Sequence, residues 1–417
     1  MDSITIILQP KDLHVTLEQQ TGLVVQAINN SGSIISYQWQ KSTEPNIWQN
    51  VGTNSNILSF IAYSSINEDK YRVILSSGSH STGLTILASD TVTVYVGPRP
   101  TNTPTPTMTP TPTSTPTKPR IYIAGVKNLV LDKSKNKLYA SVGHEIKVID
   151  TTSNQITSSF SITSPANIWK MIGNNSSLYV SDTINNQIIQ LSKSSGDIEK
   201  ITNINSYPMD IQLNDETLYV LATSHGENSL RKVQNGQTVY SLKLSEESYD
   251  RFIRLIINRN NNKAYVLDAN SESIIVVDLR YMTVDETIYL PQASKPKSME
   301  IDLSSNLIYV STENLGFLEF LIIDTNNNSI LESKIAIPYN QNGEQINVVN
   351  FNISSLNNSL YLADAYKSSS LFTMNTNNQI FTSTERLSGG CSSIVKNTSS
   401  NKLYISNGNS GIDVVQF

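Results

Sequence analysis

Seven short segments of the chain repeat one pattern of polar and apolar positions. In each segment a polar turn precedes an apolar residue, a tyrosine, and two or three further apolar or small residues. The copies are Leu138-Tyr139-Ala140, Leu178-Tyr179-Val180, Leu218-Tyr219-Val220, Ala264-Tyr265-Val266, Ile308-Tyr309-Val310, Leu360-Tyr361-Leu362 and Leu403-Tyr404-Ile405. Neighbouring tyrosines are 40, 40, 46, 44, 52 and 43 residues apart, a period close to that of four-stranded propeller blades. The repetition predicts a seven-bladed β-propeller.

Other apolar segments complete each repeat. An inner strand is expected just before each tyrosine hairpin, at Asn128–Leu131, Trp169–Ile172, Met209–Leu213, Ile253–Ile257, Met299–Leu303, Val348–Ile353 and Ser392–Lys396. A third and an outer strand follow the hairpin, as at Glu145–Ile149 and Ile156–Ser161. The predicted order within a blade is inner, second, third and outer strand.

The last repeat supplies only three predicted strands, Ser392–Lys396, Lys402–Ser406 and Ile412–Phe417. One further alternating segment, Arg120–Ala124, precedes the first repeat. A third strand without a neighbour would expose a row of unpaired N–H and C=O groups. We therefore expect Arg120–Ala124 to be the fourth strand of the seventh blade, so that it closes the ring.

The first 97 residues show a different pattern, with short alternating strands between turn residues. Such spacing is typical of a β-sandwich. The expected strands are Ile4–Gln9, His14–Leu17, Gly22–Ile28, Ile35–Lys41, Ile57–Ala62, Tyr71–Ser76 and Thr91–Val96. The chain as a whole is thus expected to be all-β.

Two aromatic residues relate this first region to a known family. Trp39 stands on one face of an alternating strand, and Tyr71 lies two residues before the apolar Val73. The region resembles an immunoglobulin-like domain, with Trp39 as the core tryptophan and Tyr71 as the tyrosine corner. Val25 and Val73 stand where antibody domains carry cysteines. The resemblance therefore implies a disulfide-free domain of the kind found in bacterial and phage surface proteins.

Residues 98–119 separate the two regions. Proline stands at nearly every second position, as in Thr103-Pro104-Thr105-Pro106, which blocks helices and sheet ladders. We expect an extended polyproline II spacer with a reach of roughly 60 Å. The alternatives are a stiff tether or a ligand for a proline-reading domain, and its threonines could carry glycans. The predicted domains are an immunoglobulin-like sandwich at 1–97, a linker at 98–119 and the propeller at 120–417.

The repeats from Arg120 onward also resemble a family. Their inner strand and tyrosine hairpin are similar to those of YVTN-type propellers and, more loosely, NHL-type propellers of surface and cell-envelope proteins. The resemblance implies an extracellular, cell-surface or virion location. We expect the chain to be monomeric in solution. Met1-Asp2-Ser3-Ile4 lacks the basic and apolar regions of a secretory signal, so either none is used or it lies upstream.

Composition narrows the range of partners. Charged residues make up 16% of the chain, below the roughly 25% typical of soluble proteins, and the net charge of −5 includes no basic run. We therefore expect no nucleic-acid partner. No apolar run approaches the roughly 20 residues of a membrane helix, so we expect no membrane insertion.

Cys391 is the single cysteine of the chain, so an internal disulfide is excluded. We expect this side chain to be buried as a small apolar residue.

The face of a propeller around its channel mouth is the default binding site. Loops between second and third strands, and loops between an outer strand and the next inner one, lie on that face. Exposed rings and amide side chains there suit a sugar or a protein partner, although some rings could instead fill the space between blades. The candidate ligand-binding residues are Trp169, Tyr207, Tyr249, Arg251, Lys297, Tyr339, His144 and His225.

Metal binding and catalysis receive little support from the sequence. Asp182, Asp268 and Asp364 each follow their tyrosine by three residues, which fits either a ring of cation ligands or an Asx turn. The four histidines show no metal-ligand spacing. We expect neither a metal nor a cofactor, and we assign no catalytic residue.

The leading hypothesis is a non-enzymatic surface or virion protein for binding or adhesion. Its propeller would recognise a glycan or a protein partner through the channel-mouth face. Two alternatives remain open. The propeller could be a hydrolase or lyase with its site at the channel mouth, or a rigid scaffold for an immunoglobulin-like domain that makes the contacts.

Overall fold

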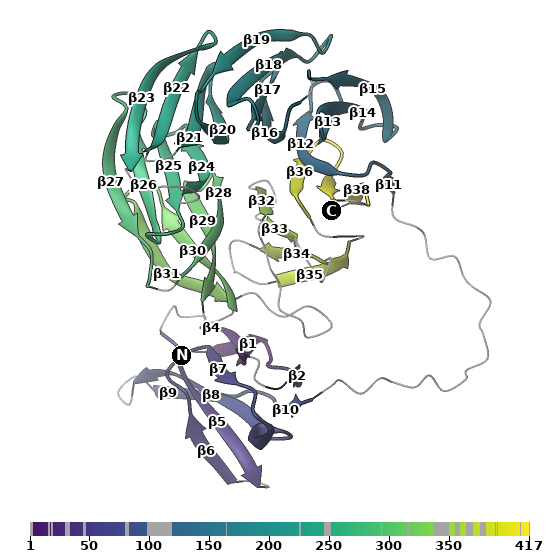
Figure 1. Ribbon diagram of the computed structural model, residues 1–417. Coiled ribbons are helices and arrows are strands. Elements are labelled where there is room, and N and C mark those ends of the chain that lie inside the picture. Colours follow the sequence, from purple (N-terminus) through teal and green to yellow (C-terminus); the bar gives the residue numbers. More distant parts are fainter. Residues whose placement is uncertain are drawn as a thin grey trace, which may run out of the picture. The chain divides into compact units, whose positions relative to one another are not determined.

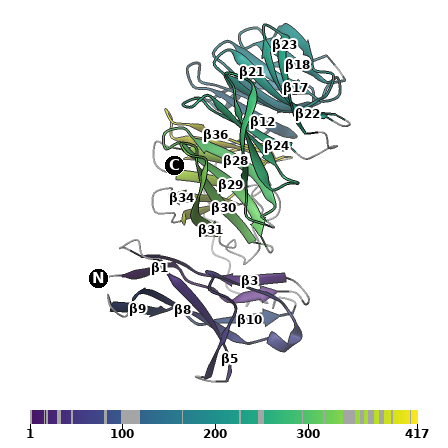
Figure 2. The same cartoon turned by 90° about the vertical axis from the view of Figure 1, so that its left-hand side faces the viewer.

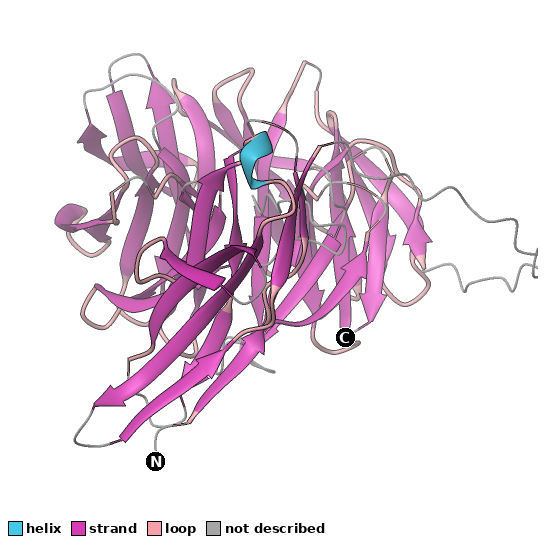
Figure 3. Cartoon of the chain, turned by 90° about the horizontal axis from the view of Figure 1, so that it is seen from below, coloured by secondary structure: helices cyan, strands magenta, loops and turns pink. Residues whose placement is uncertain are grey.

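The computed structural model describes residues 3–15, 17, 20–29, 34–44, 47–79, 83–97, 119–163, 165–224, 227–245, 252–292, 294–314, 317–336, 350–354, 359–363, 370–375, 381–387, 389, 391–408 and 410–416. The chain forms two compact units, with their strands within residues 4–96 and 120–416. Apart from one short 3-10 helix, the secondary structure of the described residues is all β (Figure 3). No helix in these ranges is long and apolar enough to cross a membrane.

The described residues of the first unit form strands in three sheets. The strands are β1 (Ile4–Leu8), β2 (Leu13–Val15), β3 (Gln20–Val24), β4 (Gln26–Asn29), β5 (Ser36–Glu44), β6 (Ile47–Val51), β7 (Ile57–Ile61), β8 (Lys70–Ser79), β9 (Gly83–Ala88) and β10 (Val92–Val96). The largest sheet has the order β2-β10-β8-β5-β6, with β9 also paired to β8, while β1 pairs with β4 and β3 with β7. The β2–β10 pair is parallel. The helix η1 (Ser64–Ile66) precedes β8.

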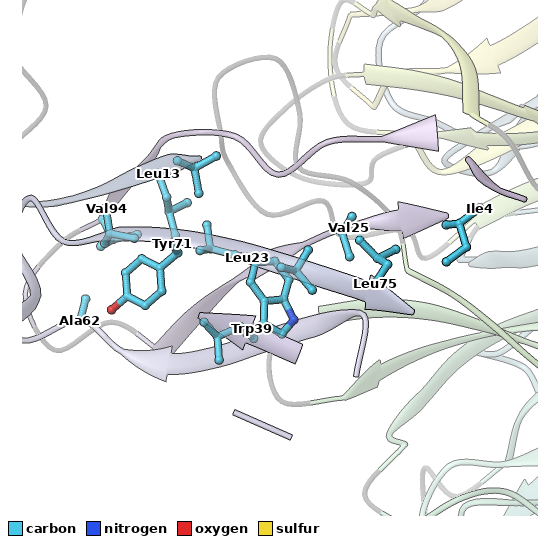
Figure 4. Close-up of a cluster of buried hydrophobic side chains, with 13 residues drawn as sticks. Ile4, Leu13, Leu23, Val25, Trp39, Ala62, Tyr71, Leu75 and Val94 are labelled. Carbon is cyan, nitrogen blue, oxygen red and sulfur yellow. The ribbon is translucent and has the colours of Figure 1, made fainter. Parts of the chain in front are cut away.

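Trp39 lies at the centre of the first unit. Its ring is fully buried in one cluster with Val25 (Figure 4) and Val73. The indole N–H donates a 2.9 Å hydrogen bond to the carbonyl of Ser55. A buried indole needs such a partner, because leaving its N–H unpaired would be costly. Tyr71 belongs to the same cluster, and burial raises the pKa of its hydroxyl to about 12, with a smaller contribution from Asp69. The prediction that Trp39 is a core residue of this region is confirmed.

Several strands of the first unit differ from the prediction. The single segment expected at Gly22–Ile28 is divided into β3 and β4 at Val25, whose backbone N–H donates to the carbonyl of Asn56. The strands β6 and β9 were not predicted at all. Most residues of β6 are exposed or half-buried, so this edge strand lacks the buried alternation that identifies a strand from sequence.

The second unit contains, among its described residues, seven four-stranded antiparallel sheets (Figures 1 and 2). The first strands are β12 (Val126–Asp132), β16 (Ile168–Gly173), β20 (Tyr207–Asn214), β24 (Phe252–Asn258), β28 (Pro296–Asp302), β32 (Asn350–Ser354) and β36 (Ser393–Asn397). The second strands are β13 (Lys137–Val142), β17 (Ser177–Asp182), β21 (Thr217–Ser224), β25 (Lys263–Asp268), β29 (Leu307–Asn314), β33 (Ser359–Ala363) and β37 (Lys402–Ser406).

The remaining strands follow in chain order. The third strands are β14 (Glu145–Asp150), β18 (Gln187–Ser192), β22 (Glu227–Gln234), β26 (Ser273–Asp278), β30 (Phe317–Asp324), β34 (Ser370–Asn375) and β38 (Ile412–Gln416). The fourth strands are β15 (Gln155–Ser161), β19 (Ile198–Asn203), β23 (Gln237–Ser245), β27 (Thr283–Tyr289), β31 (Ser329–Ala336), β35 (Phe381–Arg386) and, for the last sheet, β11 (Arg120–Ile121).

The repeated tyrosine fills the space between consecutive sheets. Tyr139 packs with Met171 and Val180 of the next sheet, and Tyr265 packs with Met299 and Val310 of the sheet that follows it. Three of these hydroxyls also donate to the turn after the third strand of the next sheet, at Lys193 O (from Tyr139), Asn328 Oδ1 (from Tyr265) and Thr151 O (from Tyr404). The tyrosine therefore joins neighbouring sheets through both packing and a hydrogen bond.

Asparagine residues shape the turns between first and second strands. Asn136, Asn262, Asn306 and Asn401 each stand three residues before the repeated tyrosine and adopt φ values of 51–56°. Asparagine tolerates this left-handed region better than most other non-glycine residues. At the start of one such turn, Asp302 accepts a 3.0 Å hydrogen bond from the N–H of Ser304. The polar turn in the sequence pattern thus has a structural cause.

The sheets form a ring that closes on itself. Each first strand contacts the first strand of the next sheet, and β36 contacts β12. At the junction β11 pairs antiparallel with β38, with Arg120 opposite Asp413. This confirms that the segment at Arg120 is the fourth strand of the last sheet, although only two of the five expected residues form the strand.

Candidate functional site

Among the described residues, the first strands of five sheets carry a β-bulge at the same place. One extra residue stands between two ladder pairs near the start of β12, β16, β20, β24 and β28. These extra residues are Lys127, Trp169, Met209, Ile253 and Lys297. A bulge breaks the ladder and re-aims neighbouring side chains, and bulges are frequent beside functional sites. We define the bulge face by Lys127, Trp169, Tyr207, Met209 and Lys297.

Serine side chains on the second strands satisfy the bulges. Ser141 Oγ accepts a 3.0 Å hydrogen bond from the N–H of Asn128, and Ser181 Oγ accepts a 2.9 Å bond from the N–H of Lys170. Both serines stand two residues after the repeated tyrosine. In these two sheets the serine therefore supports the bulge, whereas Leu221 and Leu267 stand at the equivalent positions of two others.

Trp169 and Tyr207 present aromatic surface to solvent from neighbouring sheets. Trp169 is 48% exposed and Tyr207 is 44% exposed. The carbonyl of Trp169 accepts a 3.1 Å hydrogen bond from Asn128 Nδ2, which fixes its backbone against the preceding sheet. Beside it, Lys127 Nζ donates to Asn167 Oδ1 at 3.2 Å. Exposed rings among amide groups are suited to stacking and neutral hydrogen bonds.

Two further predicted site residues lie on this edge of the ring. Lys297 Nζ is 3.0 Å from Glu313 Oε2, and both side chains are about one-third exposed, so the ion pair contributes little to stability. His144 is exposed in the turn between β13 and β14, and its carbonyl accepts from the N–H of Ile162. The predicted residues Tyr249, Arg251, Tyr339 and His225 lie outside the described part of the chain.

A group of charged residues lies just after the bulge residues on the first strands. Lys170, Asp210 and Arg254 each follow the bulge residue on three successive sheets, and Glu300 lies on the next sheet. We call these four residues the lumen cluster. Lys170 interacts electrostatically with Arg254 and with Glu300, which belong to sheets that are not its neighbours. Because the first strands contact one another around the ring, these interactions fit charged groups that lie toward its interior.

Asp210 anchors the lumen cluster. Its side chain is 2% exposed, and Lys170 Nζ lies 3.4 Å from its Oδ1. Asp210 Oδ2 accepts a 2.9 Å hydrogen bond from the N–H of Leu255 on the next sheet, while its Oδ1 accepts from the N–H of Ile211. A buried carboxylate with these donors is well satisfied. Asp210 therefore holds adjacent first strands together as well as pairing with Lys170.

Burial changes the acidity of two members of the cluster. It lowers the pKa of Lys170, with Arg254 adding to the effect while Asp210 and Glu300 oppose it. Burial also raises the pKa of Glu300, against the opposing effect of Arg254 and Lys170. Lys170 nevertheless keeps 23% of its side-chain surface accessible. A lysine side chain that is partly accessible and yet has a pKa lowered by burial fits a position facing the interior of the ring.

The recurrent aspartates of the second strands form turns. Asp182 Oδ1 accepts from the N–H groups of Asn167 and Ile184. Asp268 Oδ1 accepts from the N–H groups of Asn270 and Ser271. The bonds from Ile184 and Asn270, each two residues after its aspartate, are those of Asx turns, whereas Asp364 lies outside the described residues. Within the described ranges, no three His, Cys, Asp or Glu side chains are grouped so as to hold a metal ion.

Comparisons with known proteins identify the fold. No protein-family model and no curated protein matches the chain. Among solved structures, a chain of Kuenenia stuttgartiensis hydrazine synthase is similar, with a TM-score of 0.62 and 12% identity over 74% of this chain and 99% of that chain. A chain from a crystal structure of a mitotic checkpoint complex gives a TM-score of 0.59 and 9% identity over 72% and 90%. The second unit is a β-propeller. At these identities the similarity shows the fold alone.

The propeller's lumen cluster was not found from the sequence, because the turn before the tyrosine varies in length. Lys170 stands nine residues before Tyr179, but Arg254 stands eleven before Tyr265. Counting back nine residues from Tyr309 gives Glu300, whereas the structural equivalent of Lys170 on that blade is Ser298. An alignment of the repeats on their bulges would have placed Lys170, Asp210 and Arg254 in one register.

Proposed function

We propose that the protein is a non-enzymatic binding protein whose propeller recognises a glycan or a protein partner through the bulge face. The observation that carries this proposal is the pair of exposed rings, Trp169 and Tyr207, on neighbouring blades. Aromatic residues supply a disproportionate share of binding energy at interfaces. Here they are set on strands rather than on mobile loops, and rigid elements position a site more precisely.

We propose that the propeller has seven blades, each formed by one of the four-stranded sheets. The contacts between successive first strands and the β36–β12 contact support a closed ring. The repeated tyrosine, which packs into the following blade, supports a YVTN-like or NHL-like repeat. A location outside the cell or on a virion follows from that resemblance.

We also propose that the first unit is immunoglobulin-like. The buried Trp39 supports this assignment, as does Tyr71 two residues before Val73 in the same core. In this arrangement the Thr/Pro segment at 98–119 would join two separately folded modules. The alternative in which the first unit makes the contacts remains an outcome of the test below.

A glycan array probed with the full-length protein tests the proposal. Ligands found there are then titrated against Trp169→Ala, with Tyr281→Ala as the matched control, because Tyr281 is 65% exposed in the turn between β26 and β27, at the opposite edge of its blade. We expect Trp169→Ala to weaken binding by about 2 kcal/mol, or roughly 30-fold, and Tyr281→Ala to leave it unchanged. Equal affinities in both variants would place the binding site elsewhere, the first unit included.

A further inference from the structure

The lumen cluster contains two cations beside the bulge face. Lys170 and Arg254 follow the bulges of blades that are separated by one blade, that of Asp210. Asp210 is already engaged by two backbone N–H groups and by Lys170. Glu300 is half-buried on the next blade. The cluster therefore offers ammonium and guanidinium groups in an otherwise acidic protein with a net charge of −5.

Lys170 has the capacity for another partner. Its 3.4 Å separation from Asp210 Oδ1 exceeds the roughly 2.7–2.9 Å of a short charge-assisted hydrogen bond, and an ammonium group carries three donors. Arg254 adds a planar guanidinium, which matches the geometry of a carboxylate.

We propose that Lys170 and Arg254 bind the carboxylate of an acidic sugar, while the exposed ring of Trp169 packs against the sugar itself. This inference rests on the proposed function and specifies its ligand class. A sugar is favoured over an acidic peptide because Trp169, which is 48% exposed, directly precedes Lys170 in the chain. Trp169 and Lys170 are consecutive residues at one bulge, so a ligand that reaches both the ring and the cations would combine stacking with recognition of a carboxylate.

Calorimetric titration of the full-length protein tests the proposal with two matched pairs of probes. The first pair is trigalacturonate and its methyl ester, and the second is 3′-sialyllactose and lactose. We expect at least one acidic probe to bind tenfold or more tightly than its neutral counterpart. Equal binding within both pairs, or no binding of either acidic probe, would overturn the proposal.

Substitutions test whether the lumen cluster causes the preference for acidic probes. Lys170→Met and Arg254→Gln should each remove the preference for the acidic probe, whereas Lys200→Met and Arg280→Gln should keep it, because both control residues are exposed and lie away from the bulge face. Glu300→Gln should tighten binding severalfold by removing a competing carboxyl group. A gain in affinity cannot result from misfolding, so this variant remains informative if Lys170→Met is unstable. A preference that survives in both cluster variants would overturn the proposal.

The outcomes separate this inference from the proposed function. Trp169-dependent binding of neutral glycans without any preference for acid would overturn the inference and leave the function standing. Absence of any glycan binding would overturn the inference and would leave only a protein partner for the proposed function. Tighter binding of a polyglutamate peptide than of either sugar acid would assign the cluster to an acidic peptide instead.

Discussion

Arg120 Nε lies 3.1 Å from Asp413 Oδ1, although the two residues are 293 positions apart in the chain. The ion pair joins β11 to β38, where the two ends of the propeller segment meet. Around it, the N–H of Val414 donates to the carbonyl of Pro119, and the N–H of Gly125 donates to that of Gly408. The closure therefore depends chiefly on backbone hydrogen bonds, which Arg120 and Asp413 reinforce.

Gly411 makes this closure possible. Its φ is 112°, and a Cβ at this position would lie 2.3 Å from the carbonyl oxygen of Ile121. We expect Gly411→Ala to lower the free energy of unfolding of the propeller by about 2–4 kcal/mol, because it combines backbone strain with a clash at the closing strand. Thermal unfolding followed by circular dichroism measures the change.

Gly143→Ala is the matched control for Gly411→Ala. Gly143 also has a positive φ, of 58°, but no atom lies within 4 Å of the added Cβ. The control should cost only about 1 kcal/mol. Equal losses in the two variants would show that the backbone angle alone, rather than contact with β11, makes Gly411 necessary.

Trp39→Ala should unfold the first unit. Removal of this fully buried ring is expected to cost about 3–5 kcal/mol, a large fraction of the stability of an ordinary domain. Hydrogen exchange read by mass spectrometry should show lost protection in β5 and β8 and unchanged protection in the propeller. Trp48→Ala is the control, because its half-buried ring packs under Arg72 at 4.1 Å. Full protection of β5 in Trp39→Ala would contradict the assigned core.

Because of a buried ion pair between the first two blades, we expect the stability of the fold to fall at acidic pH. Lys193 Nζ lies 3.1 Å from Asp132 Oδ2, with side chains 3% and 5% exposed. Burial alone would raise the pKa of Asp132, but hydrogen bonds from Ser134, Lys193 and the N–H of Lys135 leave it lowered. A carboxyl with a lowered pKa stabilises the fold above its unfolded pKa, and this stability is lost as the pH falls.

Asp132→Asn removes the charge of Asp132 and leaves Lys193 buried without its counterion. We expect a loss of about 3–5 kcal/mol at pH 7, and a smaller difference from the parent near pH 3. Lys193→Met in the same background should recover part of the loss. A difference in melting temperature that is constant with pH would contradict the role of this ion pair.

The buried Lys396 is expected to destabilise the fold at neutral pH, and this effect should decrease at alkaline pH. Burial, with a smaller contribution from Lys133, lowers its pKa to about 8. The unfolded chain therefore holds this proton to higher pH than the folded one, so the charged lysine destabilises the fold at neutral pH, and the penalty fades as the pH rises from about 8 toward 10.5. Lys396→Met should raise the stability by about 1–2 kcal/mol at pH 7. This gain should shrink over that range; a gain that grows with pH would contradict the assignment.

The repeats could be predicted from the sequence because each recurring residue has a local structural role. Tyr139 and its equivalents bury a ring in the next blade, and Asn136 and its equivalents adopt the left-handed turn that precedes it. The closing strand at Arg120 was also predictable, from the row of hydrogen-bonding groups that the last repeat would leave unpaired. Both features depend on residues close in sequence or on a count of strands.

The charged residues inside the ring could not be predicted in the same way. Lys170 and Glu300 interact across three blades, and their meeting depends on the bulges and on turns of unequal length. Trp169 could be proposed from its position at the start of an inner strand, and the structure finds it exposed. Its role in binding stays a prediction.

Binding through the bulge face and recognition of an acidic sugar both require a closed ring, because only a closed ring holds Trp169 and the lumen cluster in one arrangement. The most direct test compares the melting temperature and solubility of a chain that begins at Val126 with those of a chain that begins at Pro119. The shorter chain keeps β12 and every later strand but lacks β11, so β38 is left with an unpaired edge. We predict that it is insoluble or melts well below the longer chain. Equal solubility and equal melting temperatures would contradict closure by β11.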